Sequence, residues 1–258
     1  PEIVHVLSDS GATALVYHGA FSEVVEQARV SLPNIKLFLQ VNGGDDLPLL
    51  PGAVDYDAAM ASHQPMAPIK RSGADSLLLY TGGTTGASKG VKLTQTSLLS
   101  NIAQALEVIS VGEDSLKYST AIAPLPLYHI YAYSLCFGML PAIRGHSILI
   151  PDPRNIPLFV KAIRKFKFDI FCGLNSLFVA LLQDKDFKRL DFSGLKMTLS
   201  GGMALMTSVA EDWQKVTGCV VSEGYGMTES SPVISMNPSG FEKIGTAGIP
   251  ISGTEIKV

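Results

Sequence analysis

The chain has 258 residues, of which 47% are hydrophobic and 17% are charged. This balance excludes an intrinsically disordered chain, which combines low hydrophobicity with high charge, and the length corresponds to one large domain or two small ones. A net charge of -3, without a basic stripe, argues against a nucleic-acid partner. Cys136, Cys172 and Cys219 match no zinc-binding or redox spacing, so we expect free thiols in a reducing compartment.

The expected cellular location is inferred from two kinds of segment, a membrane-spanning helix and a signal peptide, that we do not find in the given sequence. The uncharged segment Tyr118–Ile143 has no proline-free run longer than Leu127–Leu140, which is shorter than the roughly 20 apolar residues of a membrane-spanning helix. The first residues show no signal-peptide pattern. We therefore expect a cytoplasmic protein and leave peripheral attachment to the inner membrane open. Because the chain starts at Pro1 without a methionine and stops within an expected strand, Thr254–Val258, we also expect it to be part of a longer protein.

Hydrophobic periodicity predicts helices and strands in alternation along the first part of the chain. Ser22 is a candidate N-cap for a helix over Phe21–Val30, and Pro33 follows the end of that helix. Asn42–Pro68 is rich in Gly, Pro and Asp and is expected to be a surface connection. The other expected elements are the end of a helix at Glu2–Leu7, strands at Ala14–Tyr17, Lys36–Val41 and Ser76–Tyr80, and a helix at Gln95–Ile109.

The same alternation continues in the second part. Leu127–Leu140 is expected to be a buried helix. A further helix follows Asn155, a candidate N-cap, with Pro157 in its first turn and an apolar face formed by Phe159, Val160, Ile163 and Phe166. The expected strands are Ser119–Ala123, His146–Ile150, Asp169–Cys172, Lys196–Ser200 and Cys219–Glu223.

This order predicts an α/β fold built from βαβ units with largely parallel sheets. Ligand sites of such folds lie in the loops at the carboxyl ends of the strands. We therefore look for functional residues directly after the expected strands.

A loop rich in glycine and threonine follows the strand Ser76–Tyr80. Glycines let several backbone N–H groups turn toward one oxyanion, threonine hydroxyls donate to phosphate oxygens, and Lys89 adds a positive charge. The loop fits neither the Walker A pattern nor G-x-G-x-x-G, and the alternative is a plain turn. The candidate phosphate-binding residues are Thr81, Gly82, Gly83, Thr84, Thr85, Gly86 and Lys89.

A second motif follows the expected strand Cys219–Glu223. Tyr225 offers a flat ring for stacking on a base, Thr228 a hydroxyl for a phosphate, and Glu229 a hard oxygen ligand for Mg²⁺. A glycine-rich turn with a buried Tyr and a solvated Glu is the alternative. The candidate ligand-binding residues of this motif are Glu223, Gly224, Tyr225, Gly226, Met227 and Thr228.

Two further segments follow strands. Gly201, Gly202 and Met203 form the turn after Lys196–Ser200. His129 lies in the segment Pro124–Ile130. A lone His beside an apolar helix is more often a core residue than a catalyst, so His129 is a candidate substrate-site residue rather than a proton-transfer group. The other four histidines, His5 among them, have no partner at ligand spacing and are expected to be surface or core residues.

Taken together, these motifs resemble those of adenylate-forming enzymes, which include acyl-CoA synthetases, luciferases and nonribosomal peptide adenylation domains. Gly82 and Ser88 depart from the common loop, where many members have serine and proline. The Thr-Gly-Gly-Thr-Thr-Gly variant and the segment Pro151–Pro157 are most like bacterial long-chain fatty-acid–CoA ligases. By this resemblance the chain is a fragment of the family's large N-terminal domain, truncated at both ends. Residues 1–70 then form an N-terminal βαβ portion and connection, residues 71–258 an ATP- and acyl-binding core, and the C-terminal domain is absent.

The resemblance implies activation of a fatty acid by ATP to acyl-AMP, followed by thioester formation with coenzyme A. It implies Mg²⁺ held by Glu229 and Thr81, catalytic roles for Lys89, Thr228, Glu229 and His129, and an adenine pocket lined by Tyr225. The apolar stretch Ile130–Leu140 is a candidate wall of a hydrocarbon tunnel. Because the family's C-terminal catalytic lysine lies beyond Val258, we expect the isolated fragment to have little or no ligase activity.

Several alternatives stay open. One is an adenylating enzyme of other specificity, such as a short-chain or aryl-CoA ligase or a fatty-acyl-AMP ligase that loads a carrier protein. Another is a non-catalytic nucleotide- or acyl-binding module, against which the presence of Lys89 and Glu229 argues. A homodimer and a peripheral membrane contact are not decided by the sequence. The basic run Lys161–Lys167 is expected to be a solvated helix face rather than a coenzyme A contact.

Overall fold

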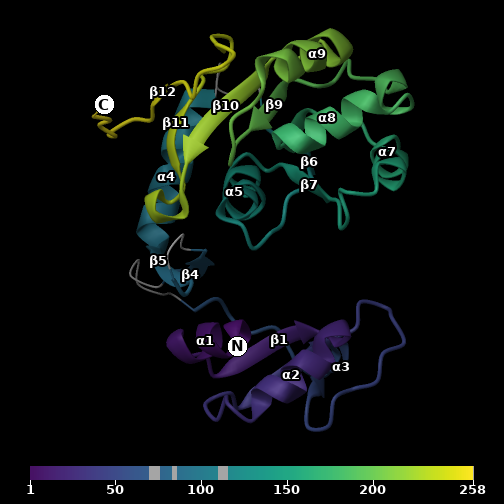
Figure 1. The fold of residues 1–258 in the computed structure, drawn as a ribbon, viewed down its shortest axis with the longest axis vertical. Helices are drawn as coiled ribbons and strands as arrows, with labels where there is room; N and C mark the ends of the chain where they lie inside the picture. The colour runs from purple at the N-terminus through teal and green to yellow at the C-terminus, as the bar shows by residue number, and fades with distance from the viewer. Residues whose placement is uncertain (70–75, 83–85, 110–115, 258) are drawn as a thin grey trace. The chain divides into compact units, whose positions relative to one another are not determined.

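The computed structural model describes residues 1–69, 76–82, 86–109 and 116–257. Its contacts group the chain into two compact units. The first unit consists of Pro1–Ser72 and Tyr80–Val91, and the second of Gly73–Leu79 and Lys92–Val258. Figure 1 shows the elements of both units. The expected division of function at residue 70 stays a prediction.

The first unit contains a three-stranded parallel sheet with its strands in chain order. Buried side chains between this sheet and its helices form a small core that includes Tyr17, Val25, Leu32 and Phe38. The strands are β1 (Ala14–His18), β2 (Leu37–Val41) and β3 (Val54–Asp55), and the helices are α1 (Glu2–Asp9), the short 3-10 turn Gly19–Phe21, α2 (Ser22–Arg29) and α3 (Tyr56–Ser62).

Two expectations for this unit are wrong. Ser22 is the first residue of α2 and not its N-cap, because its backbone is already helical. Its hydroxyl donates to Gln40 Oε1 at 3.3 Å. The stretch Asn42–Pro68 is more than a connection, since it contains β3 and α3. Asp55 starts α3 by accepting a hydrogen bond from the Ala58 N–H at 2.8 Å, as N-cap residues do.

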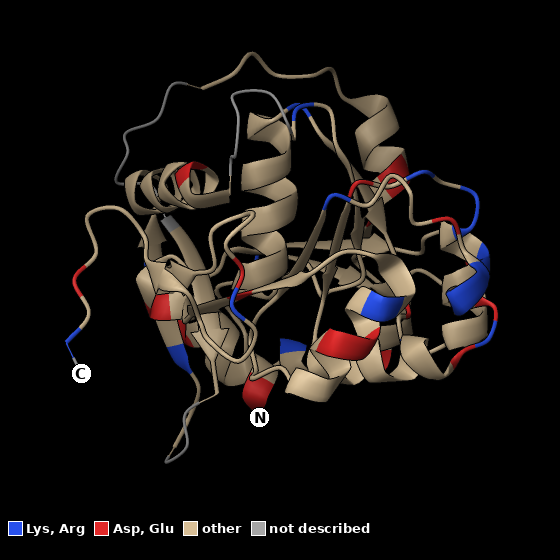
Figure 2. Cartoon of the chain, turned by 90° about the horizontal axis from the view of Figure 1, so that it is seen from above, with Lys and Arg blue, Asp and Glu red and all other residues tan. Residues whose placement is uncertain are grey.

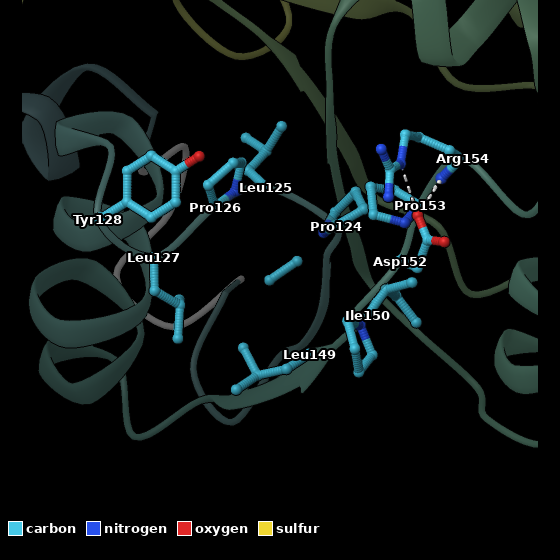
Figure 3. A pocket seen from close by; sticks show the side chains of 12 residues that line it. Pro124, Leu125, Pro126, Leu127, Tyr128, Leu149, Ile150, Asp152, Pro153 and Arg154 are labelled. Carbon is cyan, nitrogen blue, oxygen red and sulfur yellow. Dashed lines mark hydrogen bonds and ion pairs between the residues drawn. The ribbon is translucent and has the colours of Figure 1, made fainter. Parts of the chain in front are cut away.

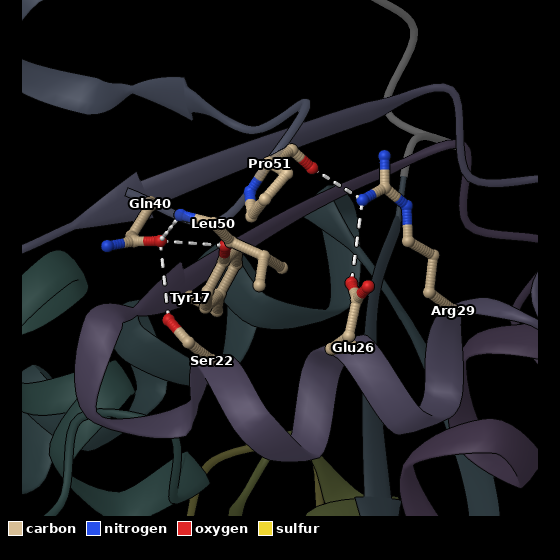
Figure 4. Close-up of polar contacts among 7 residues, drawn as sticks. All are labelled: Tyr17, Ser22, Glu26, Arg29, Gln40, Leu50 and Pro51. Carbon is tan, nitrogen blue, oxygen red and sulfur yellow. Dashed lines mark hydrogen bonds and ion pairs between the residues drawn. The ribbon is translucent and has the colours of Figure 1, made fainter. Parts of the chain in front are cut away.

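Gln40 is a fully buried polar residue at the centre of the first unit. Its Oε1 accepts hydrogen bonds from Tyr17 Oη at 3.0 Å, Ser22 Oγ at 3.3 Å and the Leu50 N–H at 2.9 Å (Figure 4). Its Nε2 donates to Asn42 Oδ1 at 2.9 Å. One side chain therefore joins β1, α2 and the loop after β2.

Replacing Gln40 with Ala should lower the free energy of unfolding of the first unit by about 2 to 4 kcal/mol, because several buried polar groups lose their partner at once. Hydrogen exchange of the β1 and β2 amides measures this loss. Gln27→Ala is the control, since Gln27 is exposed and has only a 3.4 Å contact with Glu23. Equal effects of the two substitutions would contradict the central role of Gln40.

The second unit is built on a seven-stranded sheet in the order β12-β11-β10-β9-β8-β6-β7. The pairs from β10 to β7 are parallel, whereas β11 and β12 pair antiparallel. The largely parallel α/β fold is thus confirmed. The strands are β6 (Thr120–Ala123), β7 (His146–Leu149), β8 (Ile170–Gly173), β9 (Met197–Ser200), β10 (Val221–Gly226), β11 (Val233–Met236) and β12 (Ile249–Pro250).

Helices cover both faces of this sheet (Figure 1). Alternate side chains of a strand point to opposite faces, so Ile122, Phe171 and Val221 pack against α7, α8 and α9. Ala121, Cys172 and Leu199 belong to the core on the other face, with α4 and α5. The helices are α4 (Gln95–Ile109), α5 (Ile130–Tyr133), the π-helix Ser134–Met139, α6 (Leu140–Ala142), α7 (Ile156–Ile163), α8 (Asn175–Gln183), the 3-10 turn Phe187–Arg189 and α9 (Thr207–Thr217).

The expected bounds of α4 and the N-cap Asn155 of α7 are confirmed. Three other expectations are wrong, and one strand was not expected. The expected helix Leu127–Leu140 begins only at Ile130 and continues as a π-helix from Ser134. Phe166 lies beyond the end of α7 and is 44% exposed. No strand forms over residues 254–257. The helix expected after the glycine-rich loop is preceded by a strand, β5 (Lys89–Thr94), which pairs with β4 (Ser76–Thr81).

Candidate functional site

The parallel strands of the second unit end side by side at one edge of the sheet. Gly173, Ser200 and Glu223 are register partners at the ends of β8, β9 and within β10. A Cβ added to Gly201 would lie 3.7 Å from the Gly224 carbonyl oxygen. The structure therefore brings together two motifs that are separated by about twenty residues in the sequence, the turn Gly201–Met203 and the segment that begins at Glu223.

The Glu223 carboxylate connects two loops at this edge. Its Oε2 accepts a hydrogen bond from the Leu205 N–H at 3.2 Å, and its Oε1 accepts one from the Gly245 N–H at 3.1 Å. Asn175 Oδ1 accepts from the neighbouring Met206 N–H at 3.0 Å. Glu223 thus has a structural role that the sequence did not predict, and its contact with a cofactor stays a prediction.

The segment after β10 exposes the side chains expected to bind ligand. Tyr225 is 51% exposed at the end of β10, where the pairing with β11 has a bulge between Tyr225 and Gly226. Thr228 is half-buried in the short 3-10 turn Thr228–Ser230, and Glu229 is exposed. The Met227 N–H donates to the Pro232 carbonyl at 3.1 Å and closes this loop.

Gly226 is required by close backbone packing. A Cβ at this position would lie 2.3 Å from the Pro232 carbonyl oxygen, whereas one at Gly224 would meet its nearest atoms at 3.4 Å. Glycine is therefore needed at Gly226 for the fold of the loop, whatever the loop binds.

Gly226→Ala should lower the free energy of unfolding of the second unit by about 1 to 3 kcal/mol, because backbone atoms must move to admit the methyl group. Gly224→Ala, the matched control, should cost less than about 1 kcal/mol. Urea denaturation followed by the fluorescence of Trp213, which is fully buried in this unit, measures both. A Gly226→Ala protein as stable as the control would refute the close packing.

Asn101 supports the same loop from α4. This residue is 5% exposed, and its side chain accepts a hydrogen bond from the Val233 N–H at 2.9 Å and donates to the Val233 carbonyl at 2.8 Å. These bonds fix the start of β11 against α4. The sequence contained one signal for this structural role. Asn101 is an amide side chain on the same helix face as the buried apolar residues Leu98, Ile102 and Ala105.

His129 is exposed and is the N-cap of α5. Its Nδ1 accepts a hydrogen bond from the Tyr131 N–H at 3.2 Å. In the neutral ring the proton is therefore on Nε2, which is left as a donor. This arrangement suits a group that donates to a carboxylate better than one that removes a proton.

Tyr131 joins α5 to the end of β9. Its ring lies where a Cβ on Gly201 would meet it at 3.5 Å, and its buried hydroxyl has no hydrogen-bond partner among the residues that the structure describes. Burial, and then the nearby Cys172, raise the pKa of Tyr131. Burial also raises the pKa of Cys172 and of Cys136. All three cysteines are free, as expected, and these two are poor nucleophiles near neutral pH.

A pocket of about 690 Å³ lies at the carboxyl ends of β6 and β7 (Figure 3). It is lined by residues 123–128 and 149–154, mostly proline, leucine and isoleucine. Arg154 Nε donates to Asp152 Oδ1 at 2.9 Å at its rim. The Pro124–Ile130 segment thus contributes to a pocket. The role of Ile130–Leu140 as a tunnel wall stays a prediction, because Ile130, Leu135 and Leu140 are buried residues of the core.

The phosphate loop belongs to the first unit. Thr81 ends β4 and is half-buried, Gly82 and Gly86 are exposed, and Lys89 begins β5 with an exposed side chain. Gly83, Thr84 and Thr85 lie outside the described residues. The other predicted site residues, Glu229 among them, belong to the second unit.

The acidic residues bear on metal binding. Among the residues that the structure describes, no group of three or more His, Cys, Asp or Glu side chains could hold a metal ion. Mg²⁺ is, however, commonly bound by one or two carboxylates together with substrate phosphates. The exposed carboxylate of Glu229 fits such a site.

Lys and Arg are interspersed with Asp and Glu along the chain (Figure 2). The basic run Lys161–Lys167 is not a single helix face as expected, because α7 ends at Ile163. Arg164 pairs with Asp186 at 3.7 Å, and Arg189 pairs with the same carboxylate at 3.9 Å. Within the described ranges, none of the helices has the length and apolar character needed to cross a bilayer.

Comparison with solved structures defines the class of fold. The anthranilate CoA ligase AuaEII, in complex with anthranoyl-AMP, superposes with a TM-score of 0.87 at 24% identity, over 98% of this chain and 48% of that one. The N-terminal domain of FACL13 from Mycobacterium tuberculosis gives a TM-score of 0.83 at 21% identity, over 98% and 60%. The fold is that of the large N-terminal portion of CoA ligases.

The sequence comparisons identify the family. The model of the AMP-binding enzyme family matches residues 1–258, and the chain belongs to this family. A long-chain-fatty-acid–CoA ligase of Haemophilus influenzae is 36% identical over 98% of this chain and 49% of its own length. One of Salmonella typhimurium is 34% identical over 100% and 50%, and a feruloyl-CoA synthase of Amycolatopsis is 27% identical over 100% and 48%. The chain spans about half the length of the curated relatives it matches.

Proposed function

We propose that the protein activates a long-chain fatty acid with ATP and transfers the acyl group to coenzyme A. The observation that carries this proposal is the 36% and 34% identity, along the chain, to two enzymes named long-chain-fatty-acid–CoA ligase. The feruloyl-CoA synthase, which is named for an aryl acid, is less similar at 27%. The exposed motifs at the strand ends support the same proposal.

The reaction has two balanced steps. In the first, a carboxylate oxygen of the fatty acid attacks the α-phosphorus of ATP, and the bond to the β-phosphate oxygen breaks to release pyrophosphate. In the second, the thiolate of coenzyme A attacks the acyl carbon, and AMP leaves. The first step depends on positioning and charge neutralisation more than on proton transfer.

The residues of the chain divide this work. The backbone N–H groups and hydroxyls from Thr81 to Gly86 hold the phosphates, and Lys89 neutralises their charge. Thr228 donates to a phosphate oxygen, and the carboxylate of Glu229 would hold Mg²⁺. When bound, Mg²⁺ supplies further charge neutralisation on the polyphosphate.

The second unit provides the adenine and acyl contacts. The exposed ring of Tyr225 stacks on the adenine, beside the turn Gly201–Met203 and the backbone of residues 223–227. Because Nδ1 of His129 caps α5, its Nε2 is free to donate to the carboxylate of the fatty acid. Since ATP and coenzyme A are the co-substrates, we place the enzyme in the cytoplasm.

ATP–pyrophosphate exchange by the gene product that carries this chain tests the proposal, with palmitate, acetate and benzoate at equal concentrations. We expect exchange mainly with palmitate. Exchange mainly with acetate or benzoate would keep the adenylating activity and refute the long-chain substrate. A second assay follows transfer of the acyl group to the acceptor. Equal acyl transfer to coenzyme A and to a phosphopantetheinyl carrier protein would refute coenzyme A as the specific acceptor.

Glu229→Gln should lower the rate of this exchange by about 100-fold or more, because the amide lacks the charge that holds the metal against the phosphates. Glu211→Gln, at an exposed position of α9, is the matched control and should leave the rate unchanged. Retention of most of the exchange activity in Glu229→Gln would show that Glu229 has no metal-binding role.

A further inference from the structure

Helix α1 presents two side chains to the two ends of the phosphate loop. His5 and Asp9 are four residues apart, so they lie on the same face of α1. His5 contacts Ser88, the residue before Lys89, and Asp9 contacts Tyr80, the residue before Thr81. All four residues belong to the first unit.

The contact at the second end of the loop is a hydrogen bond to the backbone. His5 Nε2 lies 2.9 Å from the Ser88 carbonyl oxygen. Because a carbonyl oxygen can only accept, Nε2 must carry the proton in this bond. The bond holds the main chain and does not depend on the Ser88 hydroxyl, for which the described residues provide no hydrogen-bond partner.

The contact at the first end is a hydrogen bond to a carboxylate. Tyr80 Oη donates to Asp9 Oδ2 at 2.6 Å, and this bond raises the pKa of the Tyr80 phenol. The ring of Tyr80 also packs edge-on against the ring of His5, with centroids 6.3 Å apart and planes at 82°. The two hydrogen bonds and the ring contact therefore join His5 and Asp9 of α1 to Tyr80 and Ser88 in one cluster.

We propose that His5 and Asp9 of α1 form a clamp that positions Thr81 and Lys89 for ATP by fixing their neighbours in the chain, Tyr80 and Ser88. The proposal rests on the proposed function, because it assumes that the loop binds the phosphates of ATP. His5 and Asp9 are positioning residues, since they act through the loop and not on the nucleotide.

The physical basis is the entropy of ordering a loop upon binding. Backbone and side chains that bind a ligand lose conformational freedom when they are ordered around it. Holding both ends in place before ATP arrives reduces this cost, as pre-organisation does in other binding sites. Loss of the clamp should therefore weaken ATP binding and leave fatty-acid binding unaffected.

Steady-state pyrophosphate exchange with the full gene product tests this selectivity. His5→Ala and Asp9→Ala should each raise the KM for ATP by about three- to tenfold, the effect of one lost hydrogen bond, with the KM for the fatty acid unchanged. Tyr80→Phe keeps the ring, removes the hydroxyl and should raise the KM for ATP as much as Asp9→Ala does. The double variant Asp9→Ala/Tyr80→Phe should raise this KM little more than either single variant. His5→Gln, which retains a donor, should restore part of the affinity.

Ser8→Ala, which changes an exposed position of α1, is the control and should leave the KM for ATP unchanged. An unchanged KM for ATP in His5→Ala and Asp9→Ala, with normal wild-type exchange, would overturn the clamp and leave the proposed function intact.

Hydrogen exchange without nucleotide provides a readout that is independent of activity. The amides of residues 86–91 should exchange about three- to tenfold faster in His5→Ala than in the wild type, while those of β2 should be unchanged. Equal exchange of residues 86–91 in both proteins would overturn the clamp. A wild-type protein that neither binds ATP nor catalyses exchange would refute the proposed function as well.

Discussion

The parallel pairing of β8, β9 and β10 is the constraint on which the candidate site of the second unit depends. Because these strands run in the same direction, their carboxyl ends and the loops that follow them meet at one edge of the sheet. The pairing is held by buried strand residues on both faces, such as Phe171 on one and Leu199 on the other. The Gly201–Met203 turn and the Tyr225–Glu229 segment become neighbours only through this register.

The loops at that edge are fixed by a small number of polar side chains that take no part in the proposed chemistry. Glu223 holds the loops at Leu205 and Gly245, and Asn101 holds the start of β11. In the first unit, His5 of α1 has the same relation to the phosphate loop at Ser88. In each case a side chain from a regular element binds the backbone of a loop, which leaves the exposed side chains of that loop available to a ligand.

The sequence predicted the fold class because short strand-like segments alternate with helical patterns along the second unit. It predicted α4 and the cap Asn155 from local signals alone. It did not predict β3, β5 or the π-helix Ser134–Met139, because these depend on pairing and packing with distant residues. For the same reason His5, Asn101 and Glu223 were not recognised as structural residues: their partners are from 18 to 132 positions away in the chain.

The central claim is that the chain contributes to the formation of an acyl-adenylate. A single-turnover reaction of the gene product with palmitate and α-labelled ATP, in the absence of coenzyme A, tests it most directly. The account predicts that palmitoyl-AMP and pyrophosphate form in equal amounts and that added coenzyme A converts the adenylate to palmitoyl-CoA and AMP. Release of ADP and phosphate in place of the adenylate would contradict the account.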